Sequence, residues 1–240
     1  MPAELVFIPG LVCDRASFAG PLEALSGLAH CMVVDPGALD SIPAMAQAVL
    51  RAAPEKFVPV GHSMGGRVAL EIYRLAPQRV AAMVLLDTGY QARAAGEAGE
   101  REAAERAELL ELARRRGMRA MGEKWLRGMV HAARLEDGAL VEAILAMIMR
   151  KTPEIFAAQI RALLARPEAG PLLAQIECPA LLLCGRQDSW SPLARHEQMA
   201  SMIRGSKLTV IEDSGHMSPM ERPREVSAAL RGWLEERSSP

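Results

Sequence analysis

Residues 57–66 read Phe57-Val58-Pro59-Val60-Gly61-His62-Ser63-Met64-Gly65-Gly66. This stretch decides the fold class, because it joins two kinds of secondary structure across one sharp turn. Residues 57–60 form a short apolar run, which indicates a buried strand, and residues 66–75 carry apolar side chains at helical spacing. A serine at such a turn has a strained backbone and an exposed hydroxyl, while the glycines on either side let neighbouring elements approach closely. The pattern therefore predicts that Ser63 is a nucleophile.

A nucleophilic serine needs a base, and the base needs an acid that orients it. His216 is the candidate base, because it lies in a turn-rich loop after the strand-like run 208–211. Such loops carry catalytic residues at the carboxyl edge of a parallel sheet. His62 lies inside the turn beside Ser63 and cannot easily reach the serine hydroxyl. The other histidines are predicted to be solvated or packing residues, and they are His30, His131 and His196.

Two aspartates are candidates for the acid. Asp188 follows the apolar run 180–184, and Asp87 follows the apolar run 82–86, so both stand at the carboxyl end of a predicted strand. Asp188 is preferred, because it gives the order serine, acid, histidine and lies one strand before the histidine loop. If one aspartate is the acid, the other is expected to cap a loop or a turn.

Strand-like and helix-like segments alternate along most of the chain. Strands are predicted at 5–8, 31–35, 57–60, 82–86, 180–184 and 208–211, and helices near 17–28, 41–53, 64–76, 192–203 and 223–236. This alternation predicts a parallel sheet with helices on both faces.

Residues 90–172 are the exception to this alternation, since no strand is predicted there. Helix-like stretches lie near 97–116, 118–131, 137–150 and 153–165. A helical insertion between two strands is expected to form a cap over the carboxyl edge of the sheet, where it excludes water from Ser63.

Four motifs in chain order give the sequence a family resemblance. Residues 61–66 resemble the nucleophile turn of the α/β-hydrolase superfamily, 185–192 its acid loop, and 214–223 its histidine loop. Residues 6–11, Val6-Phe7-Ile8-Pro9-Gly10-Leu11, resemble its oxyanion loop. The resemblance implies a sheet of about six mostly parallel strands, without the opening antiparallel hairpin of larger relatives. It also implies a core domain of residues 1–89 and 173–240, with 90–172 as the cap.

The resemblance assigns roles to the predicted site residues. Ser63 attacks an acyl carbonyl, His216 takes its proton, and Asp188 orients His216. The backbone N–H groups of Leu11 and Met64 hold the oxyanion. Many relatives carry His-Gly where this chain has Pro9-Gly10, so the rigidity of the oxyanion loop must come from another contact.

Composition favours an enzyme acting on small molecules. The chain has 28 basic and 29 acidic residues, so it lacks the excess of positive charge that would attract nucleic acid or a membrane surface. No apolar run approaches the ~20 residues of a membrane span, and residues 1–4 lack the features of a signal peptide. Cys31, Cys178 and Cys184 are expected to be reduced core residues. We therefore expect a cytoplasmic enzyme that uses neither a metal nor an organic cofactor.

Apolar side chains of the cap and the loops are expected to bind the substrate. The candidates are Trp125, Met129, Met147, Trp190 and Met217, since flexible methionines and aromatic rings suit irregular ligands. Ordinary core packing is an equally good explanation for each of them.

The resemblance is closest to bacterial carboxylesterases of the pimeloyl-ester type, which implies hydrolysis of a small to medium ester. Two alternatives stay open. One is a carbon–carbon bond hydrolase acting on ring-cleavage products, which shares the Gly61–Gly66 motif and the same three catalytic side chains. The other is a ligand-binding protein built on a hydrolase scaffold.

Overall fold

The computed structural model describes residues 2–238, which form one parallel sheet of six strands. The strands are β1 (Ala3–Ile8), β2 (Ala29–Val33), β3 (Val58–His62), β4 (Met83–Leu86), β5 (Ala180–Gly185) and β6 (Lys207–Ile211). Their order in the sheet is β2-β1-β3-β4-β5-β6, and every neighbouring pair is parallel. The predicted six-stranded sheet of the α/β-hydrolase fold is therefore confirmed.

The order of the strands locates the site. The chain runs from β1 outward to β2 and then returns to place β3 on the other side of β1. Ligands of such sheets bind outside the carboxyl ends of the strands at the point where the order reverses. Here that point lies between the loops that follow β1 and β3, and Ser63 is the first residue after β3.

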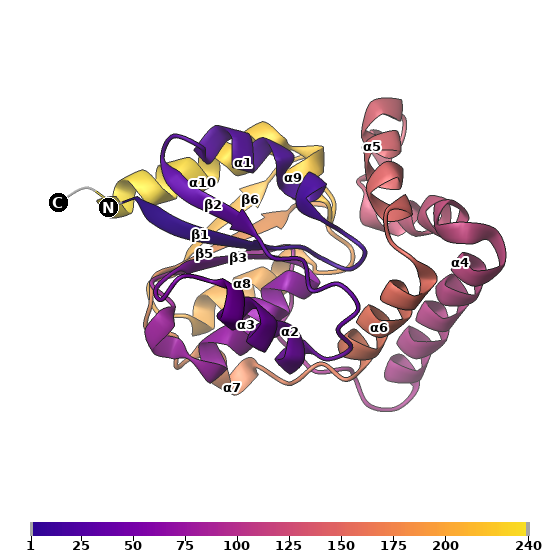
Figure 1. Cartoon of the computed structure of the whole chain (residues 1–240), viewed down its shortest axis with the longest axis horizontal. Helices are drawn as coiled ribbons and strands as arrows, with labels where there is room; N and C mark the ends of the chain where they lie inside the picture. Colours follow the sequence, from indigo (N-terminus) through magenta and orange to yellow (C-terminus); the bar gives the residue numbers. More distant parts are fainter. Residues whose placement is uncertain (1, 239–240) are drawn as a thin grey trace.

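Two layers of helices cover the sheet (Figure 1). One face packs against α1 (Ala19–Leu25) and α10 (Pro223–Ser238), and the other packs against α2 (Ile42–Ala52), α3 (Met64–Leu75) and α8 (Leu193–Met202). Alternate side chains of β1 enter different cores, because successive residues of a strand point to opposite faces. Leu5 and Phe7 lie in the core under α1 and α10, while Val6 and Ile8 lie in the other core.

The segment between β4 and β5 contains helices and loops but no strand. The helical elements are α4 (Glu97–Met129), the 3-10 turn η3 (Ala132–Arg134), α5 (Gly138–Met149), α6 (Pro153–Leu164) and the short α7 (Gly170–Leu173). In Figure 1, α4, α5 and α6 stand beside the sheet as a separate group. Helix α4 is interrupted at Gly117, where φ is 84° and ψ is 166°, at the position where the sequence analysis separates two helical stretches. Side chains of α4, α5 and α6 join the core under α2 and α3, so the group packs onto the sheet domain.

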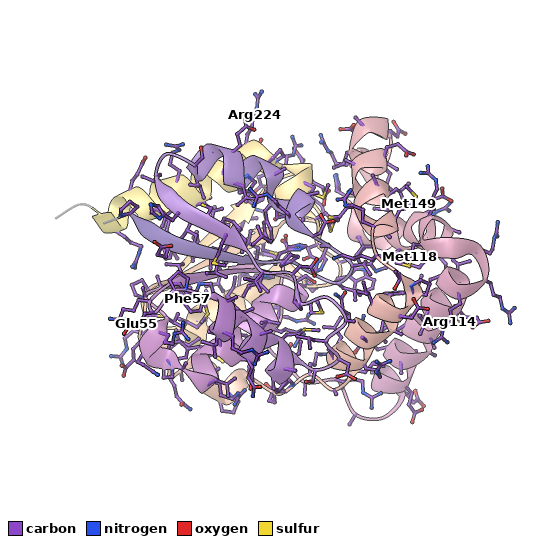
Figure 2. The ribbon with its side chains drawn as sticks, viewed as in Figure 1. Glu55, Phe57, Arg114, Met118, Met149 and Arg224 are labelled. Carbon is purple, nitrogen blue, oxygen red and sulfur yellow. The ribbon has the colours of Figure 1, made fainter. Side chains whose placement is uncertain are left out.

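The carboxyl ends of the strands point toward α4–α6. Figure 2 shows Phe57, the residue before β3, on the side of the molecule away from these helices, and Met118 of α4 on the opposite side. The turn after β3 therefore faces the group. Within residues 2–238, no helix combines the length and the apolar character needed to cross a membrane.

Most elements agree with the predicted ranges to within about two residues, and two of the differences have a clear local cause. Strand β2 begins at Ala29 and ends at Val33, so both of its ends lie two residues before those of the predicted strand 31–35. The reason is the register with β1, in which Ala3, the first residue of β1, pairs with Ala29. The helix predicted near 17–28 is divided into the 3-10 turn η1 (Arg15–Phe18) and α1. The Asp14 side chain caps η1 by accepting a hydrogen bond from the Ala16 N–H group, so the turn starts earlier than the helix pattern indicates.

Candidate active site

Ser63 lies in a strained turn between β3 and α3. Its φ of 53° and ψ of −113° lie in a region that non-glycine residues rarely occupy, at a typical cost of about 1–3 kcal/mol. The turn is possible because a Cβ atom on Gly65 would lie 1.9 Å from the Ile8 carbonyl oxygen. Only glycine permits that approach. The Ser63 carbonyl accepts a hydrogen bond of 2.6 Å from the Thr88 hydroxyl, which holds the turn in place.

The side chains of Ser63, His216 and Asp188 form a continuous hydrogen-bonded chain. His216 Nε2 lies 2.7 Å from Ser63 Oγ, and His216 Nδ1 lies 2.8 Å from Asp188 Oδ2. The second Asp188 oxygen accepts hydrogen bonds of 2.8 Å from the backbone N–H groups of Trp190 and Ser191. Asp188 is thereby fixed in the orientation that binds the imidazole ring.

This environment sets the pKa values of the pair. Burial acts to lower the pKa of His216, but the charge and hydrogen bond of Asp188 outweigh it, so the pKa lies above its ordinary value. Burial acts to raise the pKa of Asp188, but the charge and hydrogen bond of His216 and the two N–H donors hold it below its ordinary value. The pair is therefore arranged to stabilise an imidazolium next to a carboxylate.

Asp87, the alternative acid, bonds to other groups. Its Oδ1 accepts from the Gly185 N–H group at 2.9 Å, and its Oδ2 lies 2.5 Å from the Ser218 hydroxyl oxygen. The histidine beside it is His62, whose Nε2 lies 3.6 Å from Asp87 Oδ2. Burial and the nearby charge of Asp188 raise the pKa of Asp87 to about 8, so it is mostly protonated at neutral pH. Asp87 joins the last residue of β5 to Ser218, two residues after His216, and makes no hydrogen bond to His216 within the described chain.

Two other histidines are buried supports of the site. His62 Nε2 donates to the His216 carbonyl oxygen at 2.8 Å, and His196 Nε2 accepts from the Thr88 N–H group at 3.0 Å. Burial lowers the pKa of each to about 4, so both stay neutral. The packing role of His196 agrees with the sequence analysis, which did not predict that His62 holds the backbone of His216.

Glu221 fixes the backbone of the loop that carries His216. Its carboxylate accepts hydrogen bonds of 2.9–3.0 Å from the backbone N–H groups of Gly215, Met217 and His131. The last of these residues follows α4, so the same carboxylate ties the histidine loop to the inserted helices. The sequence motif places Glu221 near His216 but gives no indication of this connection.

A contact from the inserted helices holds the predicted oxyanion loop. Gln159, on α6, is fully buried, and its Oε1 accepts a hydrogen bond of 2.8 Å from the Val12 N–H group. Its Nε2 donates to the Gly37 carbonyl at 2.9 Å. Val12 has a φ of 52°, a strained value that this bond stabilises. Gln159 therefore supplies rigidity to a loop that has Pro9-Gly10 in place of His-Gly, a role that sequence reasoning missed.

An open cavity of about 410 Å³ lies beside the Ser63 and His216 end of the hydrogen-bonded chain. Ser63 and His216 line it together with both expected oxyanion residues, Leu11 and Met64. Two of the expected substrate-binding residues, Met129 and Trp190, also line it. Trp125 lines an adjoining cavity of about 200 Å³, which shares Trp190 with the first.

Met147 and Met217 occupy different positions from those expected. Both side chains are fully buried in the apolar core and line neither of these cavities. Met217 follows His216 in sequence, but successive residues of a loop can point in opposite directions. Core packing accounts for both methionines.

Charged residues in the cavity wall escaped the sequence analysis. Four arginines and two glutamates line the cavity with Ser63, namely Arg67, Arg106, Arg166, Arg195, Glu102 and Glu105. They come from α3, α4, the loop after α6, and α8. Only the spacing from Ser63 to Arg67, one helical turn, gives a sequence signal for any of them.

One group of described side chains has the composition of a metal site. Ligand atoms of Asp87, Cys184 and Asp188 all lie within 4.8 Å of one another. Burial raises the pKa of the Cys184 thiol, with the charges of both aspartates acting in the same direction. Cys184 and Asp87 therefore keep their protons near neutral pH, and Asp188 is bound to His216. Because metal ligands must be deprotonated, the chemistry of this group does not favour a cation.

Comparison with known proteins covers nearly the whole chain. The profile described as the alpha/beta hydrolase family matches residues 5–229. Among solved structures, the chain is similar to a thermophilic esterase from Thermogutta terrifontis with malate bound. The two are 27% identical with a TM-score of 0.87, and the match covers 100% of this chain and 92% of the esterase.

Two curated proteins are also similar to the chain. A pimeloyl-[acyl-carrier protein] methyl ester esterase from Aromatoleum aromaticum is 25% identical over 205 residues, covering 79% of this chain and 78% of that protein. A biotin biosynthesis bifunctional protein from Cellvibrio japonicus is 25% identical over 243 residues, covering 96% of this chain. The chain spans about half the length of the Cellvibrio protein, since the match covers 47% of it.

Proposed function

Because the chain belongs to the α/β-hydrolase family, we propose that it hydrolyses a carboxylic ester through an acyl-serine intermediate. One observation carries the proposal: Ser63 Oγ, His216 and Asp188 are joined by hydrogen bonds of 2.7 and 2.8 Å beside an open cavity. A nucleophile, a base in contact with it and an acid that orients the base are the parts that acyl transfer requires.

The proposed reaction uses each group in two half-reactions. Ser63 Oγ attacks the acyl carbonyl while His216 Nε2 takes its proton, and the N–H groups of Leu11 and Met64 stabilise the oxyanion. The tetrahedral intermediate collapses, and the alcohol leaves with the proton from His216. Water then loses a proton to His216 and attacks the acyl-serine. Collapse of the second intermediate returns the proton to Ser63 and releases the carboxylic acid. Asp188 keeps Nδ1 protonated throughout.

We further propose that residues 90–172 act as a cap on a core of residues 1–89 and 173–240. The cavity wall supports this division, because Met129, Arg106 and Arg166 come from the inserted segment and Ser63 and His216 from the core. A cap over the nucleophile excludes water when closed and admits substrate when open.

The pH dependence should follow the titration of His216. The protonated imidazole cannot accept the proton of Ser63, and the pKa of His216 is raised above its ordinary value of 6.5. We therefore expect kcat/KM for an uncharged ester to reach its maximum at pH values well above the pKa of His216. It should fall about tenfold per pH unit below the pKa, with the half-maximal point above pH 6.5. A pH profile measured with p-nitrophenyl acetate checks this, and a half-maximal point below pH 6.5 would contradict the proposed role of the Asp188–His216 pair.

The cavity size should set the acyl chain preference. A volume of about 410 Å³ is near the lower end of the range of roughly 300–1,000 Å³ for small-molecule sites. We expect p-nitrophenyl acetate and butyrate to be better substrates than the octanoate, and emulsified palmitate to be poor. Rates should rise smoothly with the concentration of dissolved ester. An abrupt increase at the solubility limit would show that the cap opens at an interface and would contradict this account.

A direct comparison of bond types tests the proposed reaction. The purified protein is given the same ester series and, separately, a dienone formed by aromatic ring cleavage. Ester turnover that exceeds dienone turnover supports the proposal. Turnover of the dienone alone would replace it with carbon–carbon bond hydrolysis, and saturable binding of both without turnover would replace it with a ligand-binding role.

A further inference from the structure

The cavity beside Ser63 contains an excess of positive charge that the proposed reaction does not use. We call Arg67, Arg106, Arg166 and Arg195 the arginine cluster, and all four line the same cavity as Ser63 and His216. Four guanidinium groups face two carboxylates in this wall, those of Glu102 and Glu105. Ester cleavage at a neutral carbonyl requires no such charge, so the cluster calls for a separate explanation.

The half-buried carboxylate of Glu102 is already bound by two members of the cluster. Arg166 holds Glu102 with both terminal nitrogens, at 2.6 and 2.8 Å. Arg106 donates to the same carboxylate through Nε at 3.0 Å. Glu105 lies on the exposed side of α4. Within residues 2–238, Arg67 and Arg195 therefore remain without a carboxylate at ion-pair distance.

Arg67 is the member with the least favourable surroundings. Its Nη1 donates to the Gln91 carbonyl at 2.8 Å, and no carboxylate of residues 2–238 lies within ion-pair distance of it. Burial lowers its pKa to about 9, and the charges of Arg166 and Arg195 act in the same direction, while the charge of Glu102 acts against them. A partly desolvated cation among like charges is costly unless an anion joins it.

Arg67 and Arg195 converge on one point. A carbon placed as a Cβ atom on Gly89 would lie 3.1 Å from Arg67 Nη2 and 3.2 Å from Arg195 Nη1. Arg195 is held there by a hydrogen bond of 3.0 Å from its Nη1 to the Trp190 carbonyl. Because both guanidinium groups lie close to this position, they provide several N–H donors for one carboxylate. Such an arrangement favours bidentate recognition.

We propose that Arg67 and Arg195 bind a carboxylate of the substrate, so that the preferred substrates are half-esters of short dicarboxylic acids. This inference rests on the proposed ester hydrolysis. Arg67 follows Ser63 by four residues on α3, which corresponds to about 6 Å along the helix axis. Ser63, Arg67 and Arg195 line one cavity of about 410 Å³, so the size of this cavity favours a short chain between the free carboxylate and the ester carbonyl.

A pair of matched substrates tests the proposal. Methyl hydrogen glutarate carries the free carboxylate, and dimethyl glutarate has the same carbon chain with that charge masked. For the wild-type protein at low salt, we expect kcat/KM to be roughly 10–100-fold higher for the half-ester, with most of the difference in KM. Arg67→Met should lower this ratio by a similar factor, and Arg67→Lys should retain part of it. Arg116→Met, on an exposed part of α4, should leave the ratio unchanged.

A binding measurement separates this proposal from the proposed reaction. Free glutarate should raise the Tm of the wild-type protein and of Ser63→Ala. It should raise the Tm of Arg67→Lys by a smaller amount. If Arg67→Met does not fold, the Lys variant and the wild-type response decide the outcome. Hydrolysis of both esters at equal rates with no effect of glutarate would overturn the anion site and leave ester hydrolysis standing. Glutarate binding that depends on Arg67, without turnover of either ester, would overturn the reaction and leave the anion site standing.

Discussion

Ser63→Ala should lower kcat for ester hydrolysis by on the order of 10⁶-fold. The Ser63 hydroxyl is the only atom group that this substitution removes, and it lies 2.7 Å from His216 Nε2 at the wall of the cavity. The backbone N–H groups of Leu11 and Met64 remain, so a small rate above that of the uncatalysed reaction should persist. Steady-state kinetics with p-nitrophenyl acetate measure the loss.

A matched serine substitution controls for damage to the fold. Ser201 is exposed on α8, and within residues 2–238 its hydroxyl donates only to the Gln198 carbonyl. Ser201→Ala should keep full activity, and both variants should unfold near the temperature of the wild-type protein. Activity of Ser63→Ala within tenfold of wild type would remove Ser63 from the mechanism.

Asp188→Asn should lower kcat by roughly 10³–10⁴-fold while the protein still folds. The asparagine oxygen can accept from the Trp190 and Ser191 N–H groups as the Asp188 Oδ1 does now, which turns its NH₂ group toward His216 Nδ1. Nδ1 must then be the acceptor, so the proton moves to Nε2. A protonated Nε2 cannot remove the proton of Ser63.

Asp87→Asn is the matched control for this prediction. Asp87 is mostly protonated at neutral pH, so a neutral amide resembles its present state, and it makes no bond to His216 within residues 2–238. We expect activity within about tenfold of wild type, a loss far smaller than that of Asp188→Asn. The reverse order of the two losses would move the acid to the end of β4.

The sequence predicts the sheet well because each strand is a short apolar run with turn residues on both sides. All six predicted strands agree with the observed ones to within two residues at each end, and the shift of β2 arises from its register with β1 at the sheet edge. The break at Gly117 was predictable because glycine interrupts a run of good helix formers. The positions of Ser63, Asp188 and His216 were predictable because each follows a strand, and parallel strands end at the same edge.

Contacts between distant segments were not predictable. Gln159 has the appearance of an ordinary helical residue, and only the packing of α6 places its amide against the Val12 N–H group. The arginine cluster is assembled from four separate segments, so no local pattern reveals it. Met147 shows the converse difficulty, since periodicity predicts that a side chain is buried but does not distinguish a core from a cavity wall.

Covalent labelling tests most directly the central claim that Ser63 is the nucleophile of an acyl-transfer site. The wild-type protein is treated with a fluorophosphonate, digested and mapped by peptide mass spectrometry. We predict one adduct, on Ser63, that forms more slowly as the pH falls through the pKa of His216 and is absent from Ser63→Ala. An adduct on another residue, or labelling that Ser63→Ala leaves unchanged, would contradict the account.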